Sequence, residues 1–156
     1  MTAEAGRGAD RGGDGPDPAW AWSPYSPDAA RPWNRARAGH LLRRAAFGAT
    51  WEEIGRAMDE GPERTADRLL RPEGDVAAFE READALEGSA AASDSAEGLR
   101  AWWLLRMMRT PHPLLEKMTL FWRGRFAVSD ARVKSGAGML GHLRILRRNA
   151  LGRFGA

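Results

Sequence analysis

Two arginines follow an aromatic pair in the stretch EKMTLFWRGRFAVSD, residues 116–130, and their spacing is the first hint of chemistry. Arg123 and Arg125 stay protonated near neutral pH, so they neither exchange protons nor bind metals there. Two guanidinium groups beside Trp122 and Phe126 could instead bind phosphate or carboxylate. Alternatively, both end a helix and complement its negative dipole. Helix ends collect basic residues for that reason alone, so we favour the second interpretation.

The acidic residues nearby offer a second kind of chemistry. Glu116 and Asp130 are the only acids after residue 99, and arginines surround each of them in the sequence. Paired carboxylates can act as general acid and base, but nothing in the sequence fixes the distance between these two. Acids in such surroundings more commonly pair with arginine, so we predict a structural salt bridge.

Metal and thiol chemistry find little support. The chain has no cysteine, which excludes disulfides and zinc–thiolate sites. His40, His112 and His142 are far apart in sequence and form no motif such as HExxH. We expect His40 to pack or to face solvent, and His112, between two prolines, to serve a turn or cap the next helix. The sequence thus predicts no metal, no cofactor and no catalytic set.

Charge is divided unevenly along the chain. Residues 1–99 hold 12 Arg and Lys against 19 Asp and Glu, a net charge of −7, whereas residues 100–156 hold 12 against 2, a net charge of +10. The basic third could bind nucleic acid, but a solvated basic face that complements the acidic part explains the same charges and is preferred. The arginines considered for nucleic acid are Arg144, Arg147, Arg148 and Arg153. The candidate anion-binding residues are Arg123, Arg125, Arg147 and Arg148.

The elements that must position these residues are helices. Apolar residues recur at helical spacing and no segment alternates like a strand, which predicts one all-α, irregular multi-helix bundle over residues 34–156. Thr50 and Glu53 form a capping-box pattern, which predicts that a helix begins there. Gly61 is predicted to end this helix. The six to seven expected helices lie within 34–48, 50–61, 62–72, 75–87, 99–109, 114–122 and 139–149, with a flexible loop at 88–98.

The expected core follows from these helices. The two most apolar helices, 99–109 and 114–122, should form the centre of the core. Trp122→Ala should therefore lower the free energy of unfolding by about 3–5 kcal/mol. Arg123→Ala should change this free energy little. The inward residues expected of helix 75–87 are Val76, Phe79, Ala83 and Leu86. The outward residues expected of the last helix are Arg144, Arg147 and Arg148.

Outside the helices, residues 1–19 are rich in glycine and mixed charge and predict a disordered tail, without the apolar segment of a secretory signal. Residues 20–33 combine proline with large aromatics, which predicts an irregular arm on the surface of the folded body. No apolar run approaches the ~20 residues of a membrane-spanning helix. The cytoplasm is therefore the default location.

Five segments, in this order, resemble the N-terminal part of the bacterial domain-of-unknown-function 1800 family. They are WSPYSPDAARPWN, AGHLLRRAAFGAT, GPERTADRLL, PHPLLEKMTLFW and RRNALGRF, within residues 22–156. The resemblance implies a mostly helical bacterial protein. It implies no reaction or substrate, because the family has no assigned activity.

The chain departs from the family pattern at two places. The family typically has Trp-His-x-His-Phe where this chain reads WRGRF, residues 122–126, and Gln-Asn where it reads Gly141-His142. Two histidines at i and i+2 could share a metal in extended structure but diverge by about 200° on a helix. Arg123 and Arg125 remove that option. If the family histidines perform chemistry, this copy is expected to have lost it.

The family also continues beyond RRNALGRF, so the end at Ala156 predicts a gene fragment, a decayed copy or a truncated gene model, with a short paralogue as the alternative. Missing helices would leave apolar surface exposed and favour self-association. The preferred function is thus a truncated, non-catalytic copy. Two alternatives stay open: a fragment of an enzyme whose active site lies mainly in the missing C-terminal part, and an anion- or nucleic-acid-binding module.

Overall fold

A computed structural model describes residues 23–92, 95–127 and 135–153, and α-helices make up most of them. The helices are α2 (Arg35–Ala45), α3 (Trp51–Leu70), α4 (Val76–Ala92), α5 (Ala96–Arg109), α6 (Pro113–Arg125) and α8 (Gly136–Asn149). These residues contain no strand, so the all-α prediction is confirmed for them. The tail predicted for residues 1–19 lies outside the described part of the chain.

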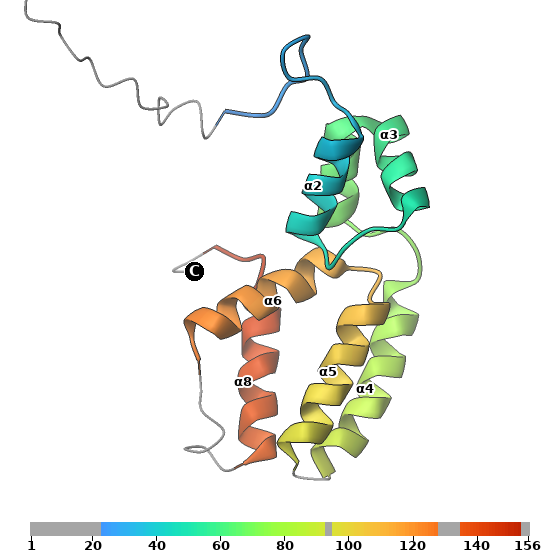
Figure 1. The fold of residues 1–156 in the computed structure, drawn as a ribbon. Coiled ribbons are helices and arrows are strands. Elements are labelled where there is room, and N and C mark those ends of the chain that lie inside the picture. Colours follow the sequence, from blue (N-terminus) through green and yellow to red (C-terminus); the bar gives the residue numbers. More distant parts are fainter. Residues whose placement is uncertain (1–22, 93–94, 128–134, 154–156) are drawn as a thin grey trace, which may run out of the picture.

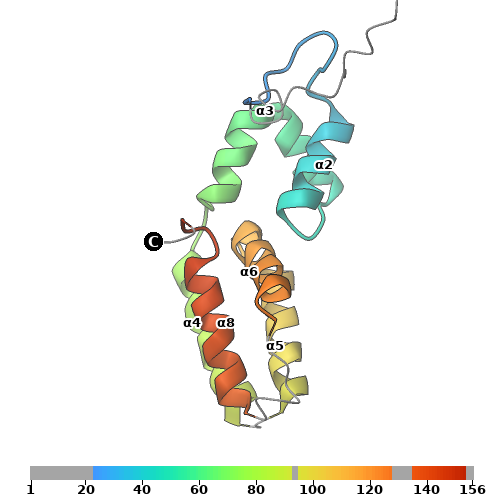
Figure 2. The ribbon, with the colours of Figure 1, turned by 90° about the vertical axis from the view of Figure 1, so that its left-hand side faces the viewer.

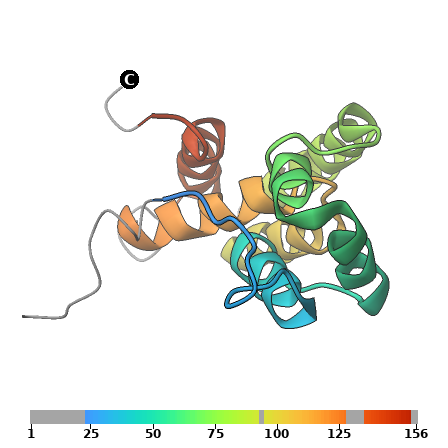
Figure 3. The same ribbon diagram turned by 90° about the horizontal axis from the view of Figure 1, so that it is seen from above.

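The helices form two groups that meet at α6. α2 and α3 pack together at one end, and α4, α5 and α8 run alongside one another at the other end (Figure 1). α6 lies between the groups and contacts helices of both (Figure 2). Seen from above, α6 lies across the molecule (Figure 3). A side chain on α6 can therefore reach several other helices at once.

α2 and α3 pack around one apolar cluster. Thr50 begins α3 with the predicted capping box: its hydroxyl accepts from the Glu53 N–H, and the Glu53 carboxylate accepts from the Thr50 N–H. Gly61 then interrupts the helix at φ 79° and ψ 173°, a conformation that favours glycine, and Pro62 starts the second half. The predicted end at Gly61 is thus a kink. The buried residues of this cluster are Ala38, Leu42, Ala57 and Leu69.

A second apolar cluster joins α5 to α8. Its buried residues are Leu99, Trp102, Trp103, Leu140 and Leu143. α6 does not supply the apolar centre that the sequence predicted, since its buried side chains are Glu116 and Thr119. Instead, α6 brings a buried carboxylate to Trp103 of this second cluster.

The loop predicted over residues 88–98 is shorter than expected. α4 continues to Ala92, and α5 begins at Ala96. Alanine has the highest helix propensity, which explains why AAA extends α4. Ser95 starts α5 as its N-cap, because the Gly98 N–H donates to the Ser95 hydroxyl at 3.4 Å.

The inner face of α4 mixes charge with the apolar residues that the sequence predicted there: Ala83 is buried and Val76 and Phe79 are half-buried, as predicted, but two carboxylates share the face. Glu87 is 6% exposed, while Leu86, predicted to point inward, is 42% exposed. Glu80, Ala83 and Glu87 lie at i, i+3 and i+7 and therefore share one face of the helix. This face meets arginines of α5 and α8, which supply partners for both carboxylates.

Candidate functional site: a ring of four charged residues

Four charged side chains meet where α6 crosses the other helices. They are Glu80 of α4, Arg106 of α5, Glu116 of α6 and Arg147 of α8. Arg106 pairs with Glu80 and, through Nε, with Oε1 of Glu116 at 2.8 Å. Arg147 pairs with Oε1 of Glu80 at 2.6 Å and with Oε1 of Glu116 at 2.7 Å. Each arginine bridges both glutamates, so the four residues close a ring, called the charge ring below.

Glu116 is the most deeply buried member of the charge ring. It is 0% exposed, and Arg106 is 3% exposed. The Trp103 indole N–H donates to Oε2 of Glu116 at 3.2 Å, so both carboxylate oxygens accept hydrogen bonds. A buried charge is tolerated only when it is paired and hydrogen-bonded in this way. The structural salt bridge predicted for Glu116 is confirmed, whereas Asp130 lies outside the described residues.

The pKa shifts of Glu116 and Arg106 favour the charged form of each side chain. Burial raises the pKa of Glu116, but the hydrogen bonds and charges of Arg147 and Arg106 outweigh it and hold the pKa below its ordinary value of 4.5. Burial lowers the pKa of Arg106, but its bonds to Glu116 and Glu80 leave that pKa raised. A carboxylate held ionised in this way is a poor proton donor near neutral pH.

His112 lies beside the charge ring, directly before α6. It stands at the N-cap position but makes no side-chain cap bond, and its Nε2 is buried with no hydrogen-bond partner among the described residues. Burial lowers the pKa of His112, as does the charge of Arg147, and these effects outweigh the opposing ones of Glu116, the Leu69 backbone and Glu80. His112 therefore resists protonation in the folded chain. It occupies the turn and the N-cap position that the sequence predicted, and its backbone N–H donates to the Thr110 hydroxyl at 3.0 Å, but its side chain does not cap the helix.

Acidification is expected to destabilise the fold in two stages. The pKa of His112 is lowered below 6.5 by folding, so the unfolded chain takes up this proton first and stability falls as the pH drops below that value. The pKa of Glu116 is also lowered, so its stabilising effect is present above pH 4.5 and is lost as the pH falls through the folded-state pKa. Urea unfolding across this range measures both stages.

Two single-histidine variants, one of them a control, test the first stage. His112→Gln should remove the loss of stability on going from about pH 7.5 to about pH 5.5. His40→Gln, at an exposed position on α2, should leave that loss in place. An unchanged pH dependence in the His112 variant would show that this histidine is solvated in the folded chain.

The two arginines after Trp122 occupy the last turn of α6. Because they are two residues apart on a helix, they point in directions about 200° apart. The Arg123 guanidinium lies 5.4 Å from the centre of the Trp103 ring, and that of Arg125 lies 5.4 Å from the centre of the Phe121 ring. The helix thus keeps them from converging on one anion, and each stacks on an aromatic side chain.

The other two anion-site candidates lie on α8. Arg147, expected to face outward, points inward to the charge ring because Glu116 and Glu80 attract it. Arg148 is exposed and, together with Arg147, lines a hollow of about 280 Å³. Arg144 pairs there with the buried Glu87 at 2.6 Å, so one carboxylate already neutralises part of this basic face.

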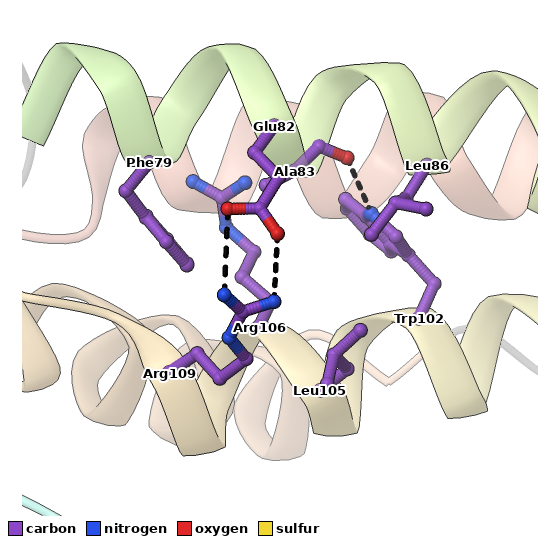
Figure 4. Close-up of a pocket in the computed structure, with 8 residues that line it drawn as sticks. All are labelled: Phe79, Glu82, Ala83, Leu86, Trp102, Leu105, Arg106 and Arg109. Atoms are coloured by element: carbon purple, nitrogen blue, oxygen red, sulfur yellow. Dashed lines mark hydrogen bonds and ion pairs between the residues drawn. The ribbon is translucent and has the colours of Figure 1, made fainter.

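A cleft between α4 and α5 is filled by its own side chains (Figure 4). Arg109 donates two hydrogen bonds to the Glu82 carboxylate, at 2.7 and 3.4 Å. Across the cleft, the Trp102 indole N–H donates to the Ala83 carbonyl at 2.8 Å. The remaining cavity of about 10 Å³ has room for about one water molecule.

Sequence reasoning found Glu116 but missed its neighbours Glu80 and Arg106. A signal was present: acids at positions 80 and 87 share one face of α4, and arginines at 144 and 147 share one face of α8. Matching charges on two helix faces indicate that the helices pack against each other. That signal becomes specific only when the two helices are known to be neighbours.

In residues 23–92, 95–127 and 135–153, no group of three His, Cys, Asp or Glu side chains is arranged to hold a metal ion. No helix in this described part is long and apolar enough to cross a membrane.

The third histidine, His142, lies with its Nε2 atom 2.9 Å from the Phe126 carbonyl oxygen, so a ring N–H can donate a hydrogen bond to that oxygen.

Comparison with known proteins identifies the family. Residues 40–156 match the family described as Protein of unknown function (DUF1800). The match includes all four members of the charge ring, and it begins after the WSPYSPDAARPWN segment. No curated protein and no solved structure matches the chain. Because the family match spans most of its length, the chain belongs to the DUF1800 family.

Proposed function

We propose that this chain is a non-catalytic member of its family, in which the charge ring holds four helices in register. The observation that supports this proposal is the environment of Glu116, which is fully buried and bound by two guanidinium groups and an indole. The carboxylate that could have served acid–base chemistry is engaged by three side chains from two other helices, α5 and α8.

The ring suits a structural role because each member comes from a different helix. A shift of α6 by one residue would rotate Glu116 by about 100° and separate its carboxylate, which is 0% exposed, from Arg106 and Arg147. An unpaired buried charge costs several kcal/mol. Alternative packings of the four helices are therefore disfavoured, and the observed register is selected.

The same geometry argues against acid–base use of Glu116. A catalytic carboxyl group needs a pKa near the working pH and contact with its substrate. The arginines lower the pKa of Glu116, and its neighbours cover both oxygens. The groups that stabilise the ring thus oppose proton transfer.

A carbon-13 NMR titration of the glutamate side-chain carboxyl carbons tests this role. The Glu116 resonance should keep the chemical shift of an ionised carboxylate at neutral pH and change only below 4.5, the ordinary pKa of the group. The exposed Glu97 provides the comparison within the same sample. A Glu116 resonance that titrates between about pH 6 and 7, as expected of a general acid or base, would contradict the proposal.

Exposed arginines support anion binding as a second proposal. Arg100, Arg125 and Arg148 are exposed and form no ion pair among the described residues. Such side chains can bind phosphate groups, and that binding weakens steeply with salt. A titration with single-stranded DNA at low and physiological salt measures it. No binding at either salt concentration would exclude a nucleic-acid role for this surface.

A further inference from the structure

A hollow of about 570 Å³ lies between the arm, α2 and the second half of α3, away from the charge ring. Its apolar lining includes Tyr25 and Trp33 of the arm, Leu41 of α2, and Pro62 and Ala66 of α3. Ligand pockets for small organic molecules have volumes of roughly 300–1,000 Å³ and mainly apolar walls. This hollow has the size and the lining of such a site.

The aromatic wall of the hollow is held in place by hydrogen bonds. The Trp33 indole N–H donates to the Ala57 carbonyl of α3 at 2.9 Å. The Tyr25 hydroxyl donates to the Arg31 carbonyl at 2.8 Å, and the Tyr25 and Trp33 rings lie with their centres 6.1 Å apart. On the opposite side, Pro62 follows the kink in α3. The arm predicted from proline and aromatic residues thus forms one wall of a preorganised site.

Positive charge is concentrated along one side of the hollow. Arg37, His40, Leu41 and Arg44 lie at i, i+3, i+4 and i+7 and share one face of α2. The Arg37 guanidinium donates to the Pro32 carbonyl at 2.5 Å and lies over the Tyr25 ring at 5.8 Å. Arg37 therefore helps to fix the arm.

Arg44 is placed differently. It is exposed at the end of α2, and its side chain forms no ion pair or hydrogen bond among the described residues. The acidic side chain in the lining, Glu63, comes from α3. An anion in the hollow would therefore be repelled from the α3 wall and attracted to the α2 side. A planar guanidinium can bind a carboxylate through two parallel hydrogen bonds.

We propose that this hollow binds a small amphipathic carboxylate. The apolar body of the ligand lies against Tyr25 and Trp33, and its carboxylate is bound by Arg44, with Arg37 adding positive charge. A neutral apolar molecule would fill the same space but leave Arg44 without a partner. Charge therefore decides which ligand is preferred, and the aromatic wall supplies most of the contact area.

Two probes of nearly the same shape test this proposal. Calorimetric titration should show that 2-naphthoate binds at least about tenfold more tightly than neutral 2-naphthamide, as expected for a hydrogen bond between charged groups. In a nitrogen-15 NMR spectrum, naphthoate should shift the Trp33 indole N–H signal. Equal affinity for the two probes, or an unchanged Trp33 signal, would overturn the proposal.

Variants separate the site from general attraction to a basic protein. Arg44→Gln should remove the preference for naphthoate, while Arg43→Gln, the neighbouring exposed arginine on α2, should retain it. Ala66→Phe should fill the hollow and reduce binding of both probes at least about tenfold. Thermal unfolding confirms that each variant is folded. Binding that survives Ala66→Phe, or that is lost equally in the two arginine variants, would show that the probe binds elsewhere.

Discussion

Replacing Glu116 with glutamine is expected to lower the free energy of unfolding by about 3–5 kcal/mol, the range found when one partner of a buried ion pair is removed. Glutamine keeps the shape of the side chain, so packing changes little. The loss arises because Arg106, at 3% exposure, and Arg147 would each keep only Glu80 as an anionic partner in the ring. The ring would then carry two positive charges and one negative charge.

Denaturant unfolding at neutral pH measures this effect. Glu97→Gln is the matched control, because Glu97 is exposed in the first turn of α5 and its replacement should cost less than about 1 kcal/mol. Combining Glu116→Gln with Arg147→Met should cost less than the sum of the single changes, since the two residues interact directly. Additive effects, or a Glu116 loss no larger than the control, would show that the ring is not a coupled buried unit.

Trp103→Ala is the second change with a large expected effect, a loss of about 3–5 kcal/mol. The side chain is 6% exposed and belongs to the cluster that joins α5 to α8. Its truncation would open a cavity in that cluster and remove the hydrogen bond to Oε2 of Glu116. The apolar core and the charge ring would therefore both be weakened by one substitution.

Trp122→Ala provides the comparison. The sequence predicted that Trp122 is a core residue, but the structure places it half-buried at the end of α6, with its indole N–H donating to the Ala150 carbonyl at 3.0 Å. We therefore expect a loss of about 1–2 kcal/mol, within the usual range for a partly buried site. Denaturant unfolding of the two variants ranks them. If Trp122→Ala cost as much as Trp103→Ala, the centre of the core would lie closer to α6 than the structure shows.

Features that depend on neighbours in the sequence were predictable. Helical periodicity identified the helices, the spacing of Thr50 and Glu53 gave the capping box, and Gly61 marked the kink in α3. Each of these depends on backbone propensities and contacts within about one helical turn. At the alanine-rich end of α4, the helix was predicted correctly but its C-terminal boundary was not: the helix continues to Ala92.

Features that depend on pairing between distant residues were predicted less well. Glu116 was identified as an ion-pair partner because the sequence offered it many arginines and few competing acids. The partners of Glu116 in the ring were not identified. When each helix is considered alone, its pattern predicts that Arg147 faces outward and that Glu80 is a surface acid. Arg147 turns inward because α6 brings the buried Glu116 carboxylate to α8. Glu80 turns inward because Arg106 of α5 and Arg147 of α8 supply cationic partners for it.

The sequence by itself thus determined an all-α chain, most of its helices and caps, and the need of Glu116 for a cationic partner. Tertiary structure alone decided which charges are buried, which apolar residues are exposed, and that the arm and α2 enclose a hollow with Arg44 at its edge. The physical reason is that burying a charged side chain changes the free energy of folding by several kcal/mol, and the sign of this change depends on the partners of the side chain. Those partners come from helices whose packing no local pattern specifies.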